Sequence, residues 1–355
     1  MRDAAPLEPI LDPSLPIIDP HHHLWDRTTS PPTPVSHPFD NVARLRPRYL
    51  LNELLADMSG GHNIVASVYL QCGSFYRSDG PAALRCVGET EFANGVAAMA
   101  ASGAYGEIRA CAGIVGYADL SLGDDVAEVL DAHIAAGGGR FRGVRRIGSY
   151  DPDPDVLGSL MRIDGGLFRS DRFRAGFARL APLGLSFDAW LLEPQIPDLI
   201  DLARAFPETP IVLDHVGTPL GIASYTGRRG ERFGIWRDNI RELARAPNVH
   251  VKLGGLAMAY PGFASFMADP PASSSQLAAE WKPYIETCIE AFGPERSMFE
   301  SNFPVDICGC SYNVLWNAFK LLAADYSPDD KAALFSATAN KFYRLGVETD
   351  RSAPA

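Results

Sequence analysis

The sequence predicts a single (β/α)8 barrel, a fold of the α/β class. Eight short apolar runs alternate with longer segments whose apolar residues recur at three- and four-residue spacing, the pattern of buried strands and amphipathic helices. Helix-to-strand connections are short, whereas several strand-to-helix connections are long. Because barrel enzymes build their active sites from strand-to-helix loops, these lengths predict one elaborated face at the carboxyl ends of the strands.

The expected strands share a near-continuous apolar character, which is typical of strands covered on both faces. They span residues 17–25, 64–72, 110–119, 140–148, 184–192, 209–217, 248–255 and 296–306. Helical patterns lie between and after them, at 50–58, 89–102, 124–137, 171–183, 195–206, 235–246, 278–292, 311–325 and 327–345. Ser327 is the expected N-cap of the last helix. A doubly wound sheet is the alternative, but it usually places a glycine-rich phosphate loop where this chain has histidines.

The length of 355 residues accommodates one large barrel with insertions, or two ordinary domains. We expect an N-terminal arm at 1–16, the barrel at 17–346 and a flexible C-terminal tail at 347–355. The arm is acidic and proline-rich and lacks the basic-then-apolar order of a signal peptide. No apolar run in the chain approaches the roughly 20 residues that cross a bilayer. These features predict a cytoplasmic protein.

The formal net charge is -11, and the chain has no basic run. This balance argues against nucleic acid and anionic membranes as partners and leaves a small-molecule substrate. The six scattered cysteines are expected to be reduced thiols. The oligomeric state is left open, a homo-oligomer included.

Histidines gather at the expected strand ends. In the segment DPHHH (19–23), alternation places Asp19, His21 and His23 on one face and His22 on the other. Two imidazoles two residues apart on a strand can converge on one metal ion or one substrate oxygen. A single His-x-His motif is as often only a polar strand end. Here, however, His215 ends the sixth expected strand on the same face of the barrel. Together the three histidines predict a site.

Several motifs resemble those of the amidohydrolase superfamily: the HxH after the first strand, LDHxG at the sixth and SNFP at the eighth. The motifs FRGVR (141–145) and VKLGG (251–255) also fit. More narrowly, the chain resembles the lactonase-type branch, which includes 2-pyrone-4,6-dicarboxylate lactonase and L-fuconolactonase. The resemblance covers nearly the whole barrel and implies hydrolysis of a carboxylic ester, usually a cyclic one.

The resemblance also implies roles for particular residues. His21 and His23 would bind a divalent metal or polarise the substrate carbonyl, and His215 would be the strand-six histidine and a third metal ligand. Arg145 would hold a substrate carboxylate, for which a guanidinium fork is well suited. Arg142 and Arg146 are near enough to compete for that role, and an ion pair at the barrel rim is the structural alternative for all three.

One departure from the superfamily pattern concerns the eighth strand. Asn302 stands where the superfamily has an aspartate, and an amide neither accepts a proton nor binds metal well. Glu300, which alternation places on the face of Asn302, Asp306 and Asp188 are then the candidate general bases. The substitution leaves two alternatives open: one zinc ion on the three histidines, or direct polarisation of the carbonyl without metal.

The remaining candidates lie at other strand ends. Lys252 and Gln71 are expected to bind substrate, with a structural salt bridge as an equal alternative for Lys252, and Trp25 is expected to form part of an apolar wall. The predicted catalytic set comprises His21, His23, His215, Asp188, Asn302 and Asp306. A metal-dependent, non-oxidative decarboxylase of an aromatic acid is the alternative activity. A barrel that has lost catalysis and only binds a ligand is a third hypothesis, motivated by Asn302.

Overall fold

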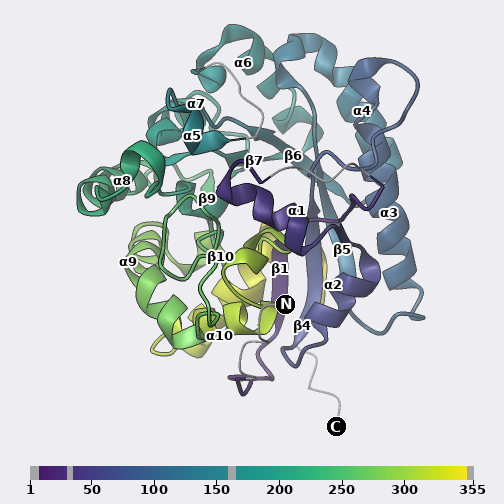
Figure 1. Ribbon diagram of the computed structural model, residues 1–355. Helices are drawn as coiled ribbons and strands as arrows, with labels where there is room; N and C mark the ends of the chain where they lie inside the picture. Colours follow the sequence, from purple (N-terminus) through teal and green to yellow (C-terminus); the bar gives the residue numbers. More distant parts are fainter. Residues whose placement is uncertain (1–7, 30–34, 159–164, 350–355) are drawn as a thin grey trace.

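The computed structural model describes residues 8–29, 35–158 and 165–349, and it confirms the predicted barrel (Figure 1). Eight parallel strands pair in chain order. They are β1 (Ile17–His22), β4 (Ile64–Leu70), β5 (Arg109–Gly116), β6 (Phe141–Ile147), β7 (Ser186–Trp190), β8 (Ile211–Leu213), β9 (Val249–Leu253) and β10 (Ser297–Phe299). The segment after β10 closes the ring, because the His23 N–H donates to the Phe303 carbonyl at 2.8 Å and the Asn302 N–H donates to the His21 carbonyl at 2.9 Å.

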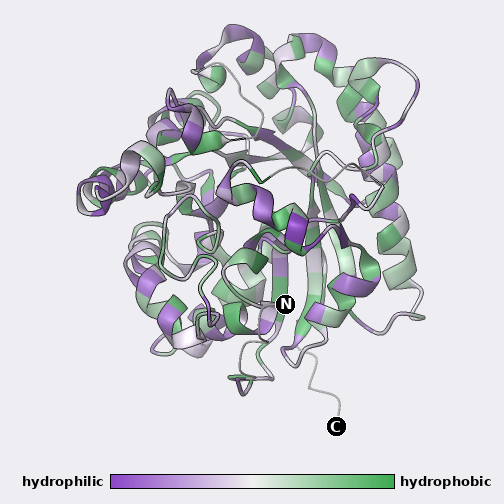
Figure 2. Ribbon diagram, in the orientation of Figure 1, coloured by the Kyte–Doolittle hydropathy of each residue, from purple (hydrophilic) through white to green (hydrophobic). Residues whose placement is uncertain are grey.

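Helices surround the strands and confirm the expected alternation (Figure 1). Their amphipathic character is visible as hydrophobic and hydrophilic residues side by side on each helix (Figure 2). The Ser327 hydroxyl caps the last helical segment by accepting from the Asp330 N–H at 3.1 Å, as predicted. The helices are α1 (Asn41–Leu45), α2 (Leu51–Met58), α3 (Val87–Ala101), α4 (Val126–Ala136), α5 (Pro154–Leu157), α6 (Asp171–Phe177), α7 (Ile196–Ala205), α8 (Arg229–Leu243), α9 (Ser274–Phe292), α10 (Tyr312–Leu322), α11 (Pro328–Ala332) and α12 (Thr338–Phe342).

All eight strands end before their predicted last residue, and the sixth and eighth do so by four residues or more. The eighth stops at Phe299 rather than at residue 306, because Asn302 adopts a left-handed backbone with φ of 53° and turns the chain out of the sheet. The sixth stops at Leu213, and His215 lies in the following 3-10 turn with φ of 57°. Both turns occur at the carboxyl ends of the strands, where the candidate site residues lie.

The half of the barrel interior nearer the amino-terminal ends of the strands is apolar. Ile18, Val68 and Met298 belong to one buried cluster there. Phe342 and Tyr343, at the end of α12 (Thr338–Phe342), pack against this cluster. The C-terminal helix therefore closes the amino-terminal end of the barrel, and any ligand must enter from the opposite end.

The chain on either side of the barrel is packed where the structure describes it. Lys320 of α10 donates to the carbonyls of Leu11 and Asp12 at 2.8 Å in the predicted arm. At the other end, the Asn340 amide donates to the Val347 carbonyl at 2.7 Å. The tail beyond residue 349 lies outside the described residues. Among the helices that the structure describes, none is long and apolar enough to cross a membrane.

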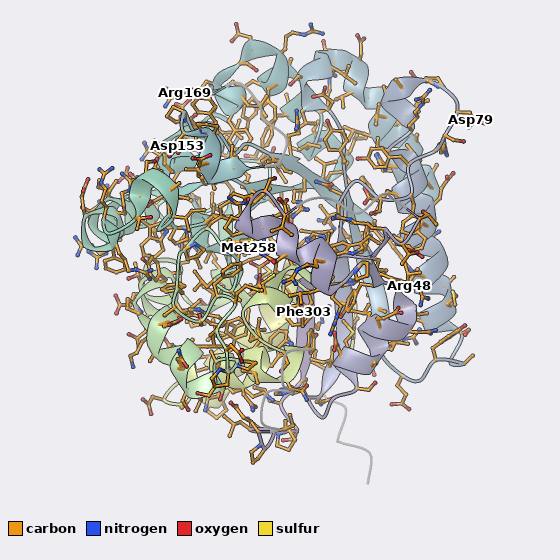
Figure 3. All side chains as sticks on the ribbon, viewed as in Figure 1. Arg48, Asp79, Asp153, Arg169, Met258 and Phe303 are labelled. Carbon is orange, nitrogen blue, oxygen red and sulfur yellow. The ribbon has the colours of Figure 1, made fainter. Side chains whose placement is uncertain are left out.

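Polar and apolar side chains are segregated as in other α/β barrels. The charged side chains of Asp79 and Arg169 lie at the periphery of the view in Figure 3, whereas Met258 and Phe303 lie toward its centre. All six cysteines are free thiols, and five of them are buried. The expectation of reduced thiols is therefore consistent with their placement in the fold.

Candidate active site

The end of β1 carries a bulge that separates Asp19 from the histidines. Three residue steps on β1, from Asp19 to His22, match two on β4. Asp19 consequently points away from His21, and its carboxylate accepts from the Ser301 hydroxyl at 2.6 Å and from the Tyr312 hydroxyl at 3.1 Å. The prediction that Asp19 shares the face of His21 is wrong, because the extra residue breaks strict alternation.

His21 and His23 do share a face, as predicted. Their Nε2 atoms are 3.2 Å apart, and His23 Nδ1 is 2.9 Å from the Leu70 carbonyl oxygen. Since a carbonyl only accepts, His23 carries its proton on Nδ1 and keeps a lone pair on Nε2. Burial lowers the pKa of both rings well below the usual range, with the nearby Lys252 and Arg145 cations contributing. Both histidines are therefore neutral at physiological pH.

A buried ion-pair network lies beside His21. Lys252 Nζ is 2.7 Å from Asp188 Oδ2, 3.0 Å from Asp214 Oδ1 and 3.2 Å from His21 Nδ1. The Tyr343 hydroxyl also donates to Asp188 Oδ2, at 2.6 Å. Burial tends to lower the pKa of Lys252, but the two carboxylates outweigh it and raise that pKa. Lys252 is therefore a fixed cation inside the barrel.

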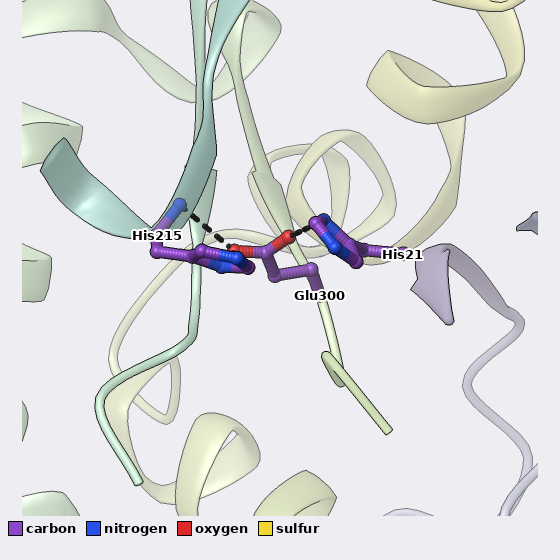
Figure 4. Close-up of side chains that lie close together, drawn as sticks. All are labelled: His21, His215 and Glu300. Carbon is purple, nitrogen blue, oxygen red and sulfur yellow. Dashed lines mark hydrogen bonds and ion pairs between the residues drawn. The ribbon is translucent and has the colours of Figure 1, made fainter. Parts of the chain in front are cut away.

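Glu300 lies between two of the histidines (Figure 4). Its Oε1 is 2.6 Å from His215 Nδ1, and its Oε2 is 2.6 Å from His21 Nδ1. Burial raises the pKa of Glu300 well above its ordinary value, with Asp214 adding to the effect, and burial lowers the pKa of His215 to about 3. The raised pKa makes ionised Glu300 a stronger proton acceptor than an ordinary carboxylate.

The VKLGG motif explains how Glu300 and His215 fit together. A Cβ on Gly254 would lie 2.5 Å from Glu300 Cγ, and a Cβ on Gly255 would lie 2.4 Å from His215 Cγ. Gly255 also has φ of +67°, which L side chains rarely adopt. The two glycines after β9 therefore make room for the carboxylate and the imidazole.

Asp188, Asp214, Lys252, Arg145 and Glu300 are named here the charged layer. When Glu300 is ionised, the layer holds one more carboxylate than cations. Glu300 Oε2 lies 2.6 Å from His21 Nδ1, and both carboxylate oxygens of Asp214 lack a hydrogen-bond partner among the described residues. Such crowded acceptors are typical of groups arranged around a cation.

The donor set next to this excess charge suits a divalent metal. One ligand atom from each of His21, His215 and Glu300 lies within 4.8 Å of the others. Two imidazoles and one carboxylate form a known catalytic zinc set, so these residues fit a metal. The set differs from the predicted trio in replacing His23 by Glu300.

Asn302 and Asp306 form a separate pair. The Asn302 amide donates to Asp306 Oδ1 at 2.8 Å, and the Ala257 N–H donates to Asp306 Oδ2 at 3.3 Å. Burial raises the pKa of Asp306 well above its ordinary value. The prediction that Asn302 shares a face with Glu300 is wrong, because the left-handed turn at Asn302 redirects its side chain. The pair joins the loops after β9 and β10.

A cavity of about 410 Å³ opens above the charged layer. Its floor includes His23, Gln71 and Arg145, and Trp25 and Trp190 contribute to its wall. The other lining residues are Arg27, Phe39, Val42, Cys72, Gly73, Tyr76, Tyr117, Arg146, Ile147 and Val305. Predicted substrate-binding residues Trp25, Gln71 and Arg145 therefore line one cavity, of the size that takes a small molecule. Lys252 does not line it and lies below, among the carboxylates.

A family model for amidohydrolases matches residues 18–345 of the chain. The chain belongs to the amidohydrolase family. A protein of Sinorhizobium fredii, y4mH, is 35% identical over 93% of this chain and 98% of its own length. The L-fucono-1,5-lactonase of Burkholderia multivorans is 29% identical over 50% of this chain and 57% of its own length.

A solved structure of a Burkholderia multivorans amidohydrolase with bound zinc is also similar. It has a TM-score of 0.70 and 25% sequence identity, and the match covers 93% of this chain and 99% of that one. These similarities place this amidohydrolase among hydrolase enzymes with lactonase-named relatives.

Sequence reasoning missed two residues of the amidohydrolase site. Asp214 contacts Lys252, and its position directly before His215 was the available signal. Tyr343 follows α12 and reaches Asp188 from below, which no local pattern indicates. Arg146 was considered only as a competitor of Arg145, although strand alternation sends the two side chains to opposite sides.

Proposed function

We propose that this amidohydrolase hydrolyses a small lactone by adding water across the ring ester. The proposal is carried by one observation: His23 and Arg145 lie together at the floor of the cavity, and each contacts the buried His21 at 3.2 Å. The names of the lactonase relatives support the same reaction class. This arrangement gives the cavity one cationic donor and one neutral base side by side.

Arg145 is the group that stabilises the developing charge. A lactone carbonyl bound at the cavity floor accepts from its guanidinium, and water attack converts that oxygen into an oxyanion. A fixed donor in a buried site stabilises such an oxyanion more strongly than water does. Arg145 is held in place because its guanidinium also donates to the Gln71 carbonyl.

His23 is the group that moves the proton. Its Nε2 lone pair accepts a proton from the attacking water as the new C–O bond forms. When the ring C–O bond breaks, the leaving alkoxide takes that proton, and the product is a hydroxy acid. His21 supports this step when its own proton is on Nδ1, facing Glu300. Its Nε2 then accepts a hydrogen bond from Arg145 and donates none to His23, so the lone pair of His23 Nε2 stays available for the water.

A metal fits this proposal without replacing those roles. A divalent ion held by His21, His215 and Glu300 would polarise the carbonyl and lower the pKa of a bound water. Elemental analysis of protein purified without chelator tests its presence. Stoichiometric zinc in the wild type that is lost in Glu300→Gln would identify this ligand set.

The function is tested by a screen of lactones and aromatic acids, with and without added zinc or manganese. We expect lactone turnover, and we expect His23→Gln to reduce it by about 100-fold or more. His250→Gln is the matched control, since His250 begins β9 at the opposite end of the barrel. Carbon dioxide release without lactone turnover would instead support the decarboxylase, and an inert wild type would support a binding-only barrel.

A further inference from the structure

A second cavity, of about 460 Å³, lies at the amino-terminal ends of β5 and β6 and is named here the arginine cavity. Arg109 is the first residue of β5, Arg140 directly precedes β6, and Arg142 lies at the start of β6. All three arginines line the cavity. The cavity above the charged layer lies at the carboxyl ends of the strands, so the two cavities occupy opposite ends of the barrel.

Short side chains and a fixed segment bound the arginine cavity. The alanines of its wall are Ala97 and Ala101 of α3 and Ala110 and Ala112 of β5. Residues 345–348 form another part of the wall. This segment is held in place, because the Asn340 amide donates to the Val347 carbonyl at 2.7 Å and its oxygen accepts from the Val347 N–H at 3.2 Å. The cavity is therefore enclosed by ordered elements of the fold.

The protein balances the positive charge of this cavity poorly. Arg140 donates to the Asn94 side-chain oxygen at 2.8 Å, and Arg142 donates to the Gly139 carbonyl at 2.6 Å, so both acceptors are neutral. None of the three arginines forms an ion pair with a carboxylate of the described residues. Glu348 is the one acidic residue among the described residues of the lining. Three arginines against one glutamate leave two positive charges.

Arg142 shows the effect of this imbalance directly. Burial lowers the pKa of Arg142, and the nearby Arg344 and Arg140 cations lower it further. Like charges held close together repel one another, and an anion placed among them relieves that repulsion. The cavity therefore favours an anionic ligand, although the chain as a whole has a formal net charge of -11.

We propose that the arginine cavity binds a phosphate group, either as the free ion or as the monoester of a small molecule. A phosphate monoester carries a charge between about -1.5 and -2 near pH 7 and offers three acceptor oxygens. This charge matches the two uncompensated positive charges, whereas a carboxylate would neutralise only one of them. Planar guanidinium groups donate in pairs to phosphate oxygens. A cavity of this volume also has room for a small organic group attached to the phosphate.

Calorimetry with glycerol phosphate, inorganic phosphate and glycerol, all at one ionic strength, tests this site. We expect the phosphate probes to bind at one site per chain and glycerol not to bind. Tighter binding of glycerol phosphate would identify a monoester as the ligand, and equal or tighter binding of inorganic phosphate would identify the free ion. If neither phosphate probe binds, or if glycerol binds as tightly as its phosphate, the proposal is overturned.

Variants of the arginines locate the bound phosphate. Arg109→Gln and Arg140→Gln should each weaken phosphate binding by about tenfold or more. Arg109 is exposed at the beginning of β5, so its replacement leaves the packing of the barrel unchanged. Phosphate binding that is unchanged in both variants contradicts the assignment to this cavity.

Two control variants separate the arginine cavity from other positive charges. Arg237→Gln removes one charge from α8, which lies across the barrel from α3 (Figure 1). Arg146→Gln removes an arginine from the cavity above the charged layer. Both controls should bind the phosphate probes as the wild type does. An equal loss in Arg237→Gln would show a general effect of net charge, and a loss in Arg146→Gln would place the phosphate in the other cavity; either result overturns the proposal. The measurement involves no turnover, so its outcome is independent of the proposed lactonase function.

Discussion

The charged layer and the cavity wall above it treat their charges in opposite ways. Lys252 lies within 3.0 Å of two carboxylates, and the acidic groups around it are fully buried. Arg146 in the wall is also buried, yet two of its nitrogens have no hydrogen-bond partner among the described residues. Lys252 has its partners within the fold, whereas Arg146 does not. Fixed charges suit catalysis, because they need no rearrangement during the reaction, and free donors suit recognition.

Removing the cation of the layer should have the largest effect. Lys252→Met leaves Asp188 and Asp214 buried without their closest positive charge, and breaking a buried pair in this way destabilises by about 3–5 kcal/mol. We expect a loss of that size in the free energy of unfolding, measured by urea denaturation, together with loss of activity. Lys282→Met is the control, since the exposed Lys282–Glu286 pair on α9 should contribute less than about 1 kcal/mol. Equal stabilities for the two variants would contradict the comparison.

Changing Glu300 should affect activity more than stability. Glu300→Gln keeps the shape of the side chain but removes the carboxylate that faces His21 Nδ1 and holds the His21 proton there, so kcat should fall by about 100-fold or more. KM should change little, because Glu300 does not line the cavity. Asp306→Asn is the matched variant, since Asp306 is equally buried but bonds to Asn302. A larger loss of kcat in Asp306→Asn would make Asp306 the carboxylate that supports the reaction instead.

The effect of burial alone can be measured at His133, far from the charged layer. Burial lowers the pKa of His133 to about 4, and its ring bonds Thr90 Oγ1 at 2.8 Å. The His133 ring takes up a proton near pH 6.5 in the unfolded chain, whereas in the folded protein it does so only near pH 4. The stabilisation that comes from keeping this ring neutral is therefore complete above pH 6.5. It is lost as the pH falls toward 4, by an amount on the order of 2–3 kcal/mol.

His133→Gln should therefore flatten the dependence of unfolding free energy on pH between 6.5 and 4. Urea denaturation at several pH values measures it. His250 and His62 have similarly lowered pKa values, so part of the slope should remain. An unchanged slope in His133→Gln would show that this ring is protonated in the folded protein.

Much of the barrel could be predicted from the sequence because its signals are local. Strand composition, helical spacing and unequal loops each depend on residues close together in the chain, and His21, His23 and His215 follow from their strand ends. The bulge after Asp19 and the left-handed turn at Asn302 could not be predicted, because each inserts or reverses one residue without changing composition. One such step moves every following side chain to the other face.

The charged layer itself depends on contacts between distant segments. The sequence left Lys252 open between an anion anchor and a structural salt bridge, because its carboxylate partners lie on β7 and directly after β8. Tyr343 belongs to a C-terminal segment that folds into the amino end of the barrel. A pattern read along the chain shows such groups one at a time, and only the closed barrel shows that they lie together.

Arg146 should give the smallest change in stability and the clearest contrast with Lys252. Arg146→Met removes a buried cation whose donors are not hydrogen-bonded, so the free energy of unfolding should stay within about 0.5 kcal/mol of the wild type or rise by up to about 1 kcal/mol. Urea denaturation measures this effect. A loss above about 1 kcal/mol would mean that the contacts of Arg146 with Tyr117 and Asp119 stabilise the fold. The wall would then resemble the charged layer, and the contrast between them would not hold.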